Sequence, residues 1–77
     1  MSNTQFQHLL SKARDAKVGG RDAWSVQSTG EKLAVAMALN RPDWIASMGY
    51  TLAEAIGRID SDWLELIPKV ERALEEE

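Results

Sequence analysis

The only histidine in the chain, His8, is the first residue to consider for chemistry, because an imidazole can bind a metal or act as a general base. On a helical wheel it lies opposite the apolar stripe that starts at Phe6, so we expect its side chain to be exposed. No second metal ligand is suggested near it, and neither a nucleophile elbow nor a glycine-rich oxyanion motif accompanies it. The pattern therefore predicts neither a metal site nor a Ser–His–carboxylate triad.

Two other groupings resemble fragments of catalytic or phosphate sites. Asp60 and Asp62 could serve as general acid and base only inside a cleft, and short helices offer little concave volume, so helix capping is their expected role. The segment 19–21 (Gly-Gly-Arg) is too short for a phosphate loop, and no strand leads into it. We therefore expect a protein that is not an enzyme, with no cofactor, no metal and no small-molecule substrate.

Length and composition predict a single helical domain over residues 1–77. The apolar fraction of 44% is typical of a globular chain, and the absence of cysteine removes disulfides and thiolate metal sites. The longest apolar run, residues 33–39, is too short to cross a bilayer, and the first twelve residues lack the pattern of a signal peptide. We expect a cytoplasmic protein without membrane contact.

The charges divide the chain into two halves of opposite sign. Residues 1–41 carry six basic and three acidic side chains, whereas residues 42–77 carry three basic and nine acidic ones. The total of −3 disfavours nucleic acid as a partner. The asymmetry fits either two ordinary solvated faces or a polarity that orients a protein partner or a second copy of the chain.

Hydrophobic periodicity predicts helices over most of the chain. The first should cover residues 3–17, with Ser2 at a capping position, and end at the glycine pair. Residues 21–27 are expected to form a loop that folds Trp24 back over the helices as a lid. A second helix, over residues 29–39, is apolar all round and should occupy the centre of the bundle.

Three further helices are expected in the second half. A short one starts at Pro42, a fourth opens at the capping box of Thr51 and Glu54, and the last covers residues 62–76 with a kink or a restart at Pro68. The expected fold class is thus all-α, a compact bundle of four or five short helices. The predicted core consists of Phe6, Leu9, Leu10, Leu33, Val35, Met37, Leu39, Trp44, Ile45, Leu52, Ile56, Ile59, Trp63, Leu66, Ile67 and Val70.

Five residues are candidates for contact with a partner. Ala34 and Ala38, four residues apart, could form a smooth strip on which a second copy of the chain packs closely. Gly57, followed by Arg58, lies on the polar side of the fourth helix, where glycine costs stability relative to alanine. It is kept either for close approach of another backbone or by tolerated drift, and drift is favoured. Trp24 would be an interface anchor if it were partly exposed, although a role as a core plug is favoured.

These features favour a small non-catalytic protein–protein interaction module or regulatory adaptor, with self-association as one option. The alternative is a helix-turn-helix DNA-binding regulator formed by residues 51–74. Against that alternative, its recognition helix would begin with the acidic segment 62–65 and would contain Pro68. A variant is that the acidic second half imitates DNA and inhibits a DNA-binding protein.

Overall fold

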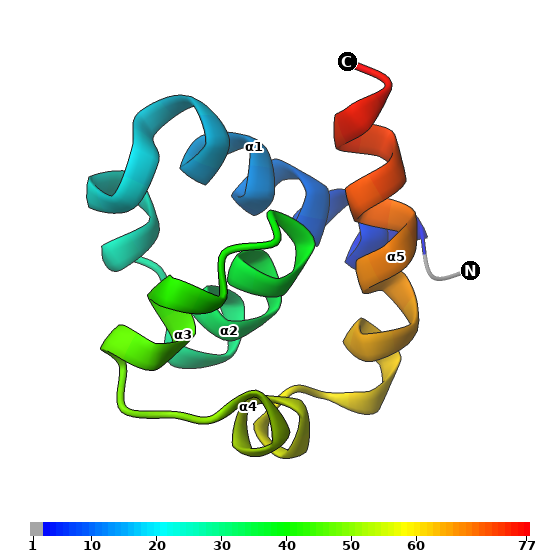
Figure 1. The fold of residues 1–77 in the computed structure, drawn as a ribbon. Coiled ribbons are helices and arrows are strands. Elements are labelled where there is room, and N and C mark those ends of the chain that lie inside the picture. Colours follow the sequence, from blue (N-terminus) through cyan, green and yellow to red (C-terminus); the bar gives the residue numbers. More distant parts are fainter. Residues whose placement is uncertain (1–2) are drawn as a thin grey trace.

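Helices account for nearly all of the computed structural model, which describes residues 3–77 and has no strand in that range (Figure 1). The helices are α1 (Asn3–Ser25), α2 (Thr29–Ala38), α3 (Pro42–Ser47), α4 (Leu52–Arg58) and α5 (Ser61–Glu75). They form a globule with principal extents of 32 × 26 × 19 Å. The expected all-α bundle is therefore confirmed, although the cap predicted at Ser2 falls outside the described residues.

Helix α2 lies at the centre, as its all-round apolar sequence predicts, and packs against each of the other four helices. Its start is set by a complete capping box, in which the Ser28 side chain accepts from the backbone of Glu31 and the Glu31 carboxylate accepts from the Ser28 N–H. The chain leaves α2 through Asn40, which adopts a left-handed conformation with φ of 57°. Five residues of α2 are buried: Leu33, Ala34, Val35, Ala36 and Ala38.

Helix α1 departs from the sequence prediction at its second half. The chain kinks at Gly20, where φ is 73° and ψ is −158°, and then continues as helix to Ser25. Gly19 makes the kink possible, because a Cβ there would lie 2.7 Å from the Cβ of Ala23. The predicted end of the first helical segment at the glycine pair is therefore confirmed. The prediction of a loop over residues 21–27 is wrong for its first five residues, because a second helical segment starts directly after Gly20.

The kink carries Trp24 into the interior, where only 3% of its surface stays exposed. Its indole Nε1 donates a hydrogen bond of 2.8 Å to the carbonyl of Lys32 in α2. Its ring packs on that of Trp44 from α3, with centroids 4.9 Å apart. Trp24 thus joins α1, α2 and α3 as a core residue.

Helix α5 packs against α1 and α2 and buries Leu66, Val70 and Leu74. It passes through Pro68 as one helix, so the predicted restart there is wrong. Pro68 is itself exposed, and the buried residues before and after it hold both halves of α5 against the core. A proline on the outer face can thus be accommodated despite the lost backbone hydrogen bond.

The observed core differs from the predicted one in three ways. Leu52 and Ile56, both expected inside, are 51% and 46% exposed. Several predicted core residues are only partly buried: Phe6, Met37, Leu39, Trp63 and Ile67. Small side chains take more of the interior than expected, because closely packed helices leave room for little else: Ala13, Ala16, Ala34, Ala36, Ala38 and Ala55.

None of the helices described in residues 3–77 is both long enough and apolar enough to cross a bilayer.

Candidate functional site

Helix α4 presents an apolar surface to solvent. Leu52 and Ile56 are one helical turn apart and are 51% and 46% exposed. Ala53 and Gly57 are exposed beside them, and a Cβ added at Gly57 would meet no atom within 4 Å. With roughly 100° of rotation per residue, these four side chains occupy one continuous side of α4. We call Leu52, Ala53, Ile56 and Gly57 the α4 stripe.

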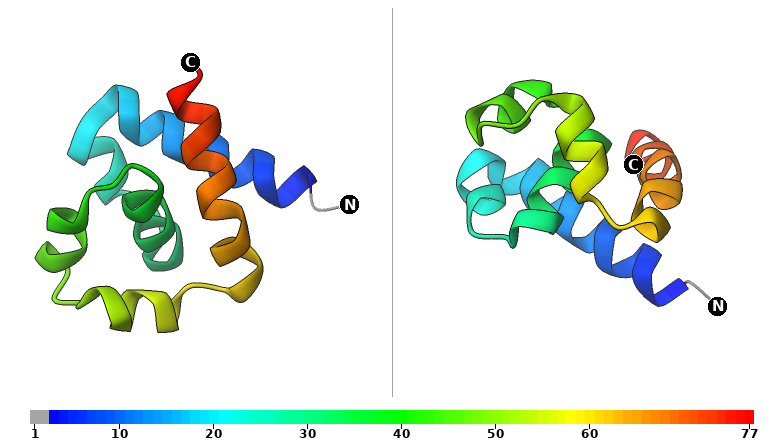
Figure 2. Two further views of the ribbon diagram at one scale, coloured as in Figure 1. Left: turned by 45° about the vertical axis from the view of Figure 1, so that its right-hand side comes forward. Right: turned by 90° about the horizontal axis from the view of Figure 1, so that it is seen from below.

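The orientation of α4 follows from what it buries. Ala55, with no exposed surface, and Ile59, with 5%, face the interior, and α4 packs against α2 and α3. The small side chain of Ala55 lets the backbone of α4 approach its neighbours closely. Because α4 has only seven residues, burying this side leaves Leu52 and Ile56 at the edge of the contact. In Figure 1 and in the left view of Figure 2, α4 lies at the end of the molecule away from the C-terminal end of α5.

One edge of the α4 stripe is bordered by two opposite charges, Glu54 and Arg58. Hydrogen bonds from the backbone N–H and the side chain of Thr51, with the nearby positive charge of Arg58, lower the pKa of Glu54 below its ordinary value of 4.5. Arg58 also lies over the ring of Tyr50, with its guanidinium carbon 5.5 Å from the ring centroid. The border of the stripe therefore carries one fixed negative and one fixed positive charge at neutral pH.

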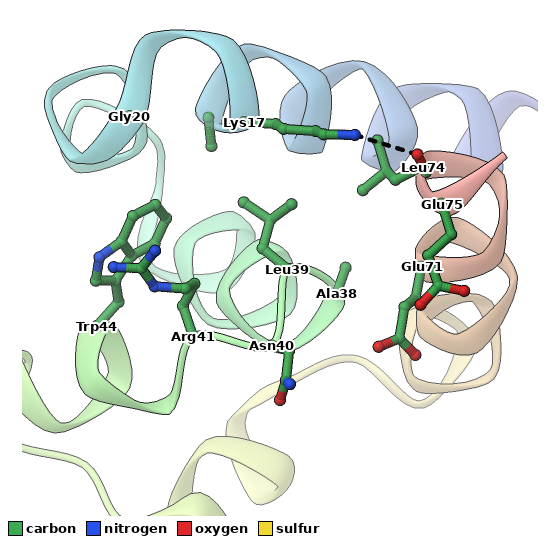
Figure 3. A pocket seen from close by; sticks show the side chains of 11 residues that line it. Lys17, Gly20, Ala38, Leu39, Asn40, Arg41, Trp44, Glu71, Leu74 and Glu75 are labelled. Atoms are coloured by element: carbon green, nitrogen blue, oxygen red, sulfur yellow. Dashed lines mark hydrogen bonds between the residues drawn. The ribbon is translucent and has the colours of Figure 1, made fainter. Parts of the chain in front are cut away.

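A hollow of about 370 Å³ lies on another part of the surface, between α1, the α2–α3 turn and α5 (Figure 3). Ala38, Leu39 and Leu74 line its apolar part. Lys17 extends across it, and its Nζ donates a 3.1 Å hydrogen bond to the carbonyl of Leu74, as Figure 3 shows. This contact gives a second donor to a carbonyl in the last turn of α5, which also accepts from the backbone N–H of Glu77.

The charges around this hollow are mixed and partly engaged. Arg41 lies over the ring of Trp44 at 4.8 Å and contacts Asp43 at 3.3 Å, whereas Glu71 and Glu75 line the side formed by α5. The lining contains no histidine, cysteine or serine, and its ionisable side chains are Lys17, Arg41, Glu71 and Glu75. The hollow is large enough to receive a side chain of another molecule.

His8 joins three helices at the surface. Its Nε2 lies 2.7 Å from the Glu31 carboxylate at the start of α2, and its ring is 5.9 Å from that of Trp63 in α5. The side chain is exposed, as the helical wheel predicts. Across residues 3–77, no three metal-ligating side chains gather into a group that could hold an ion.

The candidate partner-binding residues separate into two groups. Trp24, Ala34 and Ala38 are at most 3% exposed, so the strip expected to receive a second copy lies in the core, although Ala38 also lines the hollow beside α5. Gly57 and Arg58 are exposed on α4, at the α4 stripe and on its border.

Sequence reasoning missed Leu52 and Ile56 as surface residues. Their period matches an apolar stripe, but a second apolar pair lies on another side, with Ala55 in α4 and Ile59 at its C-cap, and so short a helix buries only one of the two pairs. The presence of apolar residues on more than one side of α4 is the signal that could have identified them.

No family model, no curated protein and no solved structure matches this chain in the comparisons.

Proposed function

We propose that this chain is a small, non-catalytic protein-binding module or regulatory adaptor that contacts its partner through the α4 stripe. The observation that carries the proposal is the exposure of Leu52 and Ile56, 51% and 46%, side by side on one short helix. Covering large apolar side chains gains roughly 25 cal/mol for each Å² removed from water. Adjacent exposed apolar residues of this size are therefore typical of a protein contact surface.

A second exposed apolar pair provides a matched comparison. Val18 and Val26 are 89% and 84% exposed and line a separate shallow hollow beside the kink in α1. They are smaller than leucine and isoleucine, and charged and polar residues such as Lys12, Asp15 and Gln27 line the same hollow. Val18 and Val26 are the more exposed pair, but the α4 stripe combines larger apolar side chains that are one helical turn apart.

The charge at the start of α5 favours a protein partner over DNA. Helices α4 and α5 are separated by Ile59 and Asp60 alone, which is the arrangement of a helix-turn-helix unit. However, Asp60 caps α5 through its contact with the backbone of Asp62, and Glu65 is exposed in the following turn. These carboxylates would repel the phosphates that a recognition helix must approach.

The proposal is tested by capture from a lysate of the source organism with three forms of the protein. The wild type, the double variant L52S/I56S and the control V18S/V26S are used as baits, each with and without nuclease. We expect one partner that survives nuclease, is retained by the control and is lost with L52S/I56S. Because Leu52 and Ile56 are about half exposed, the serine variant should keep its helical circular dichroism.

Equal capture by all three baits, or loss only with V18S/V26S, would remove the α4 stripe as the contact surface. Recovery of nucleic acid would favour the DNA-binding alternative if nuclease treatment also removes the captured proteins.

A further inference from the structure

The apolar and charged residues on the exposed side of α4 are arranged so that this side can match the same side of a second copy. On a helical wheel, the α4 stripe covers somewhat more than a third of the circumference. One edge of the stripe is Ala55, buried against the rest of the molecule, and the other edge is formed by Glu54 and Arg58. Only the edge with Glu54 and Arg58 is free to meet charges on another molecule.

Two copies of α4 that pack stripe against stripe in antiparallel directions bring this free edge of one copy against the same edge of the other. In that arrangement Glu54 of one copy lies beside Arg58 of the second, and the two-fold symmetry repeats the pair. The four charges then alternate in sign. A parallel arrangement would instead set the charged edge against the buried edge of the other copy and leave the charges unmatched.

The small residues of the stripe suit the same contact. Gly57 has no atom within 4 Å of where a Cβ would be, and Ala53 lies one turn before it. A pair of small residues four positions apart lets two helix backbones approach closely, so that Leu52 and Ile56 of each copy can pack beside the crossing point.

We infer that the molecule seated on the α4 stripe is a second copy of this chain, docked antiparallel about a two-fold axis with Glu54 of each copy paired to Arg58 of the other. This inference rests on the proposed function of the α4 stripe. A helix of seven residues covers far less than the roughly 800 Å² per partner of a standard interface. The dimer is therefore weak, with a dissociation constant of about 0.1–1 mM.

The first test is a dilution series of the ¹⁵N-labelled full chain from about 1 mM to 0.05 mM, followed by amide chemical shifts. We expect concentration-dependent shifts on α4 and the adjoining residues, which disappear in L52S/I56S and persist in V18S/V26S. Absence of such shifts up to the highest concentration, or shifts that map to another surface, overturns the inference.

The second test uses the charges. Arg58→Glu and Glu54→Arg each place like charges together at the contact, and each should weaken self-association by about fivefold or more. An equal mixture of the two variants restores both opposite-charge pairs, so unlabelled E54R added to labelled R58E should bring the α4 shifts back. Mixing without any effect overturns the antiparallel contact, and circular dichroism of each variant excludes unfolding as the cause of the weakening.

The two proposals fail in different ways. If self-association is absent but the lysate capture depends on Leu52 and Ile56, the α4 stripe binds a different protein and only the inference of a second copy is lost. If neither experiment depends on Leu52 and Ile56, the proposed function of the stripe is lost as well.

Discussion

The indole rings of Trp24 and Trp44 pack against each other at a tilt of 34°, with their centroids 4.9 Å apart. Trp24 comes from the turn of helix that follows the kink in α1, and Trp44 comes from α3. The pair joins segments that are 20 residues apart in the sequence. Trp24 also donates a hydrogen bond to the carbonyl of Lys32 in α2. Its side chain therefore holds α1, α2 and α3 together.

Trp24→Phe should therefore destabilise the fold by about 1–3 kcal/mol, because it removes the donor to the partly buried Lys32 carbonyl as well as part of the packing on Trp44. The measurement is the free energy of unfolding in urea, followed by circular dichroism. Val18→Ala, at a position that is 89% exposed, serves as the control and should change stability by less than about 0.5 kcal/mol. Equal effects of the two substitutions would contradict the central role of Trp24.

Gly20→Ala should destabilise the protein by about 1–3 kcal/mol. Its φ of 73° with ψ of −158° lies in a region that only glycine adopts without strain. Gly57→Ala is the matched control: φ is ordinary, the space around it is open, and alanine should stabilise α4 by about 0.5–1 kcal/mol. In urea unfolding, the free energy of unfolding should fall for Gly20→Ala and rise for Gly57→Ala. A Gly20→Ala protein as stable as the wild type would show that the kink is not required.

The Glu31 carboxylate should make stability depend on pH in the acid range. Partial burial raises its pKa, but hydrogen bonds from the Ser28 N–H and from His8, with the nearby charge of Lys12, outweigh burial and lower it below the ordinary value of 4.5. A carboxyl whose pKa is lower in the folded state stabilises the fold above the unfolded value. That contribution is lost as pH falls from about 4.5 through the folded pKa.

The measurement is the urea midpoint of the wild type and of Glu31→Gln at pH 7, 5 and 3. We expect the wild type to be more stable at pH 7 and 5, and the difference to shrink at pH 3. A difference that stays constant over this range would show that the ionised carboxylate of Glu31 adds nothing beyond what an amide provides.

Ala34→Leu should destabilise the monomer by about 1–3 kcal/mol without changing its self-association. Ala34 has no exposed surface, so a larger side chain must displace its neighbours in the core. Urea unfolding gives the stability, and sedimentation velocity gives the size in solution. A change in size with unchanged stability would instead place Ala34 at a contact between two copies.

Local signals in the sequence determined where most helices begin and end. The capping boxes of Ser28 with Glu31 and of Thr51 with Glu54 form as their spacing predicts, and Asn40 adopts the left-handed conformation two residues before Pro42. These features depend on side chains that bond to their own backbone within three or four residues. The all-round apolar composition of α2 likewise indicated its central position, because no other position covers every side of it.

Contacts between segments that are distant in the sequence determined the features that local sequence signals did not specify. The glycine pair at residues 19–20 ends one helical segment, as the sequence predicts, but the sequence does not show that the next residues form a second one. Packing of Trp24 on Trp44 stabilises that second segment. Tertiary contacts also determine the rotation of α4 about its axis. Its sequence offers two apolar sides, and packing on α2 and α3 buries Ala55 and Ile59.

The candidate site is therefore a product of the tertiary structure. Leu52 and Ile56 have the residue types and spacing of core positions, and only the packing of α4 leaves them at the surface. The reason is geometric. Periodicity fixes which residues share a side of a helix, but the direction in which that side points depends on neighbours that come from elsewhere in the chain.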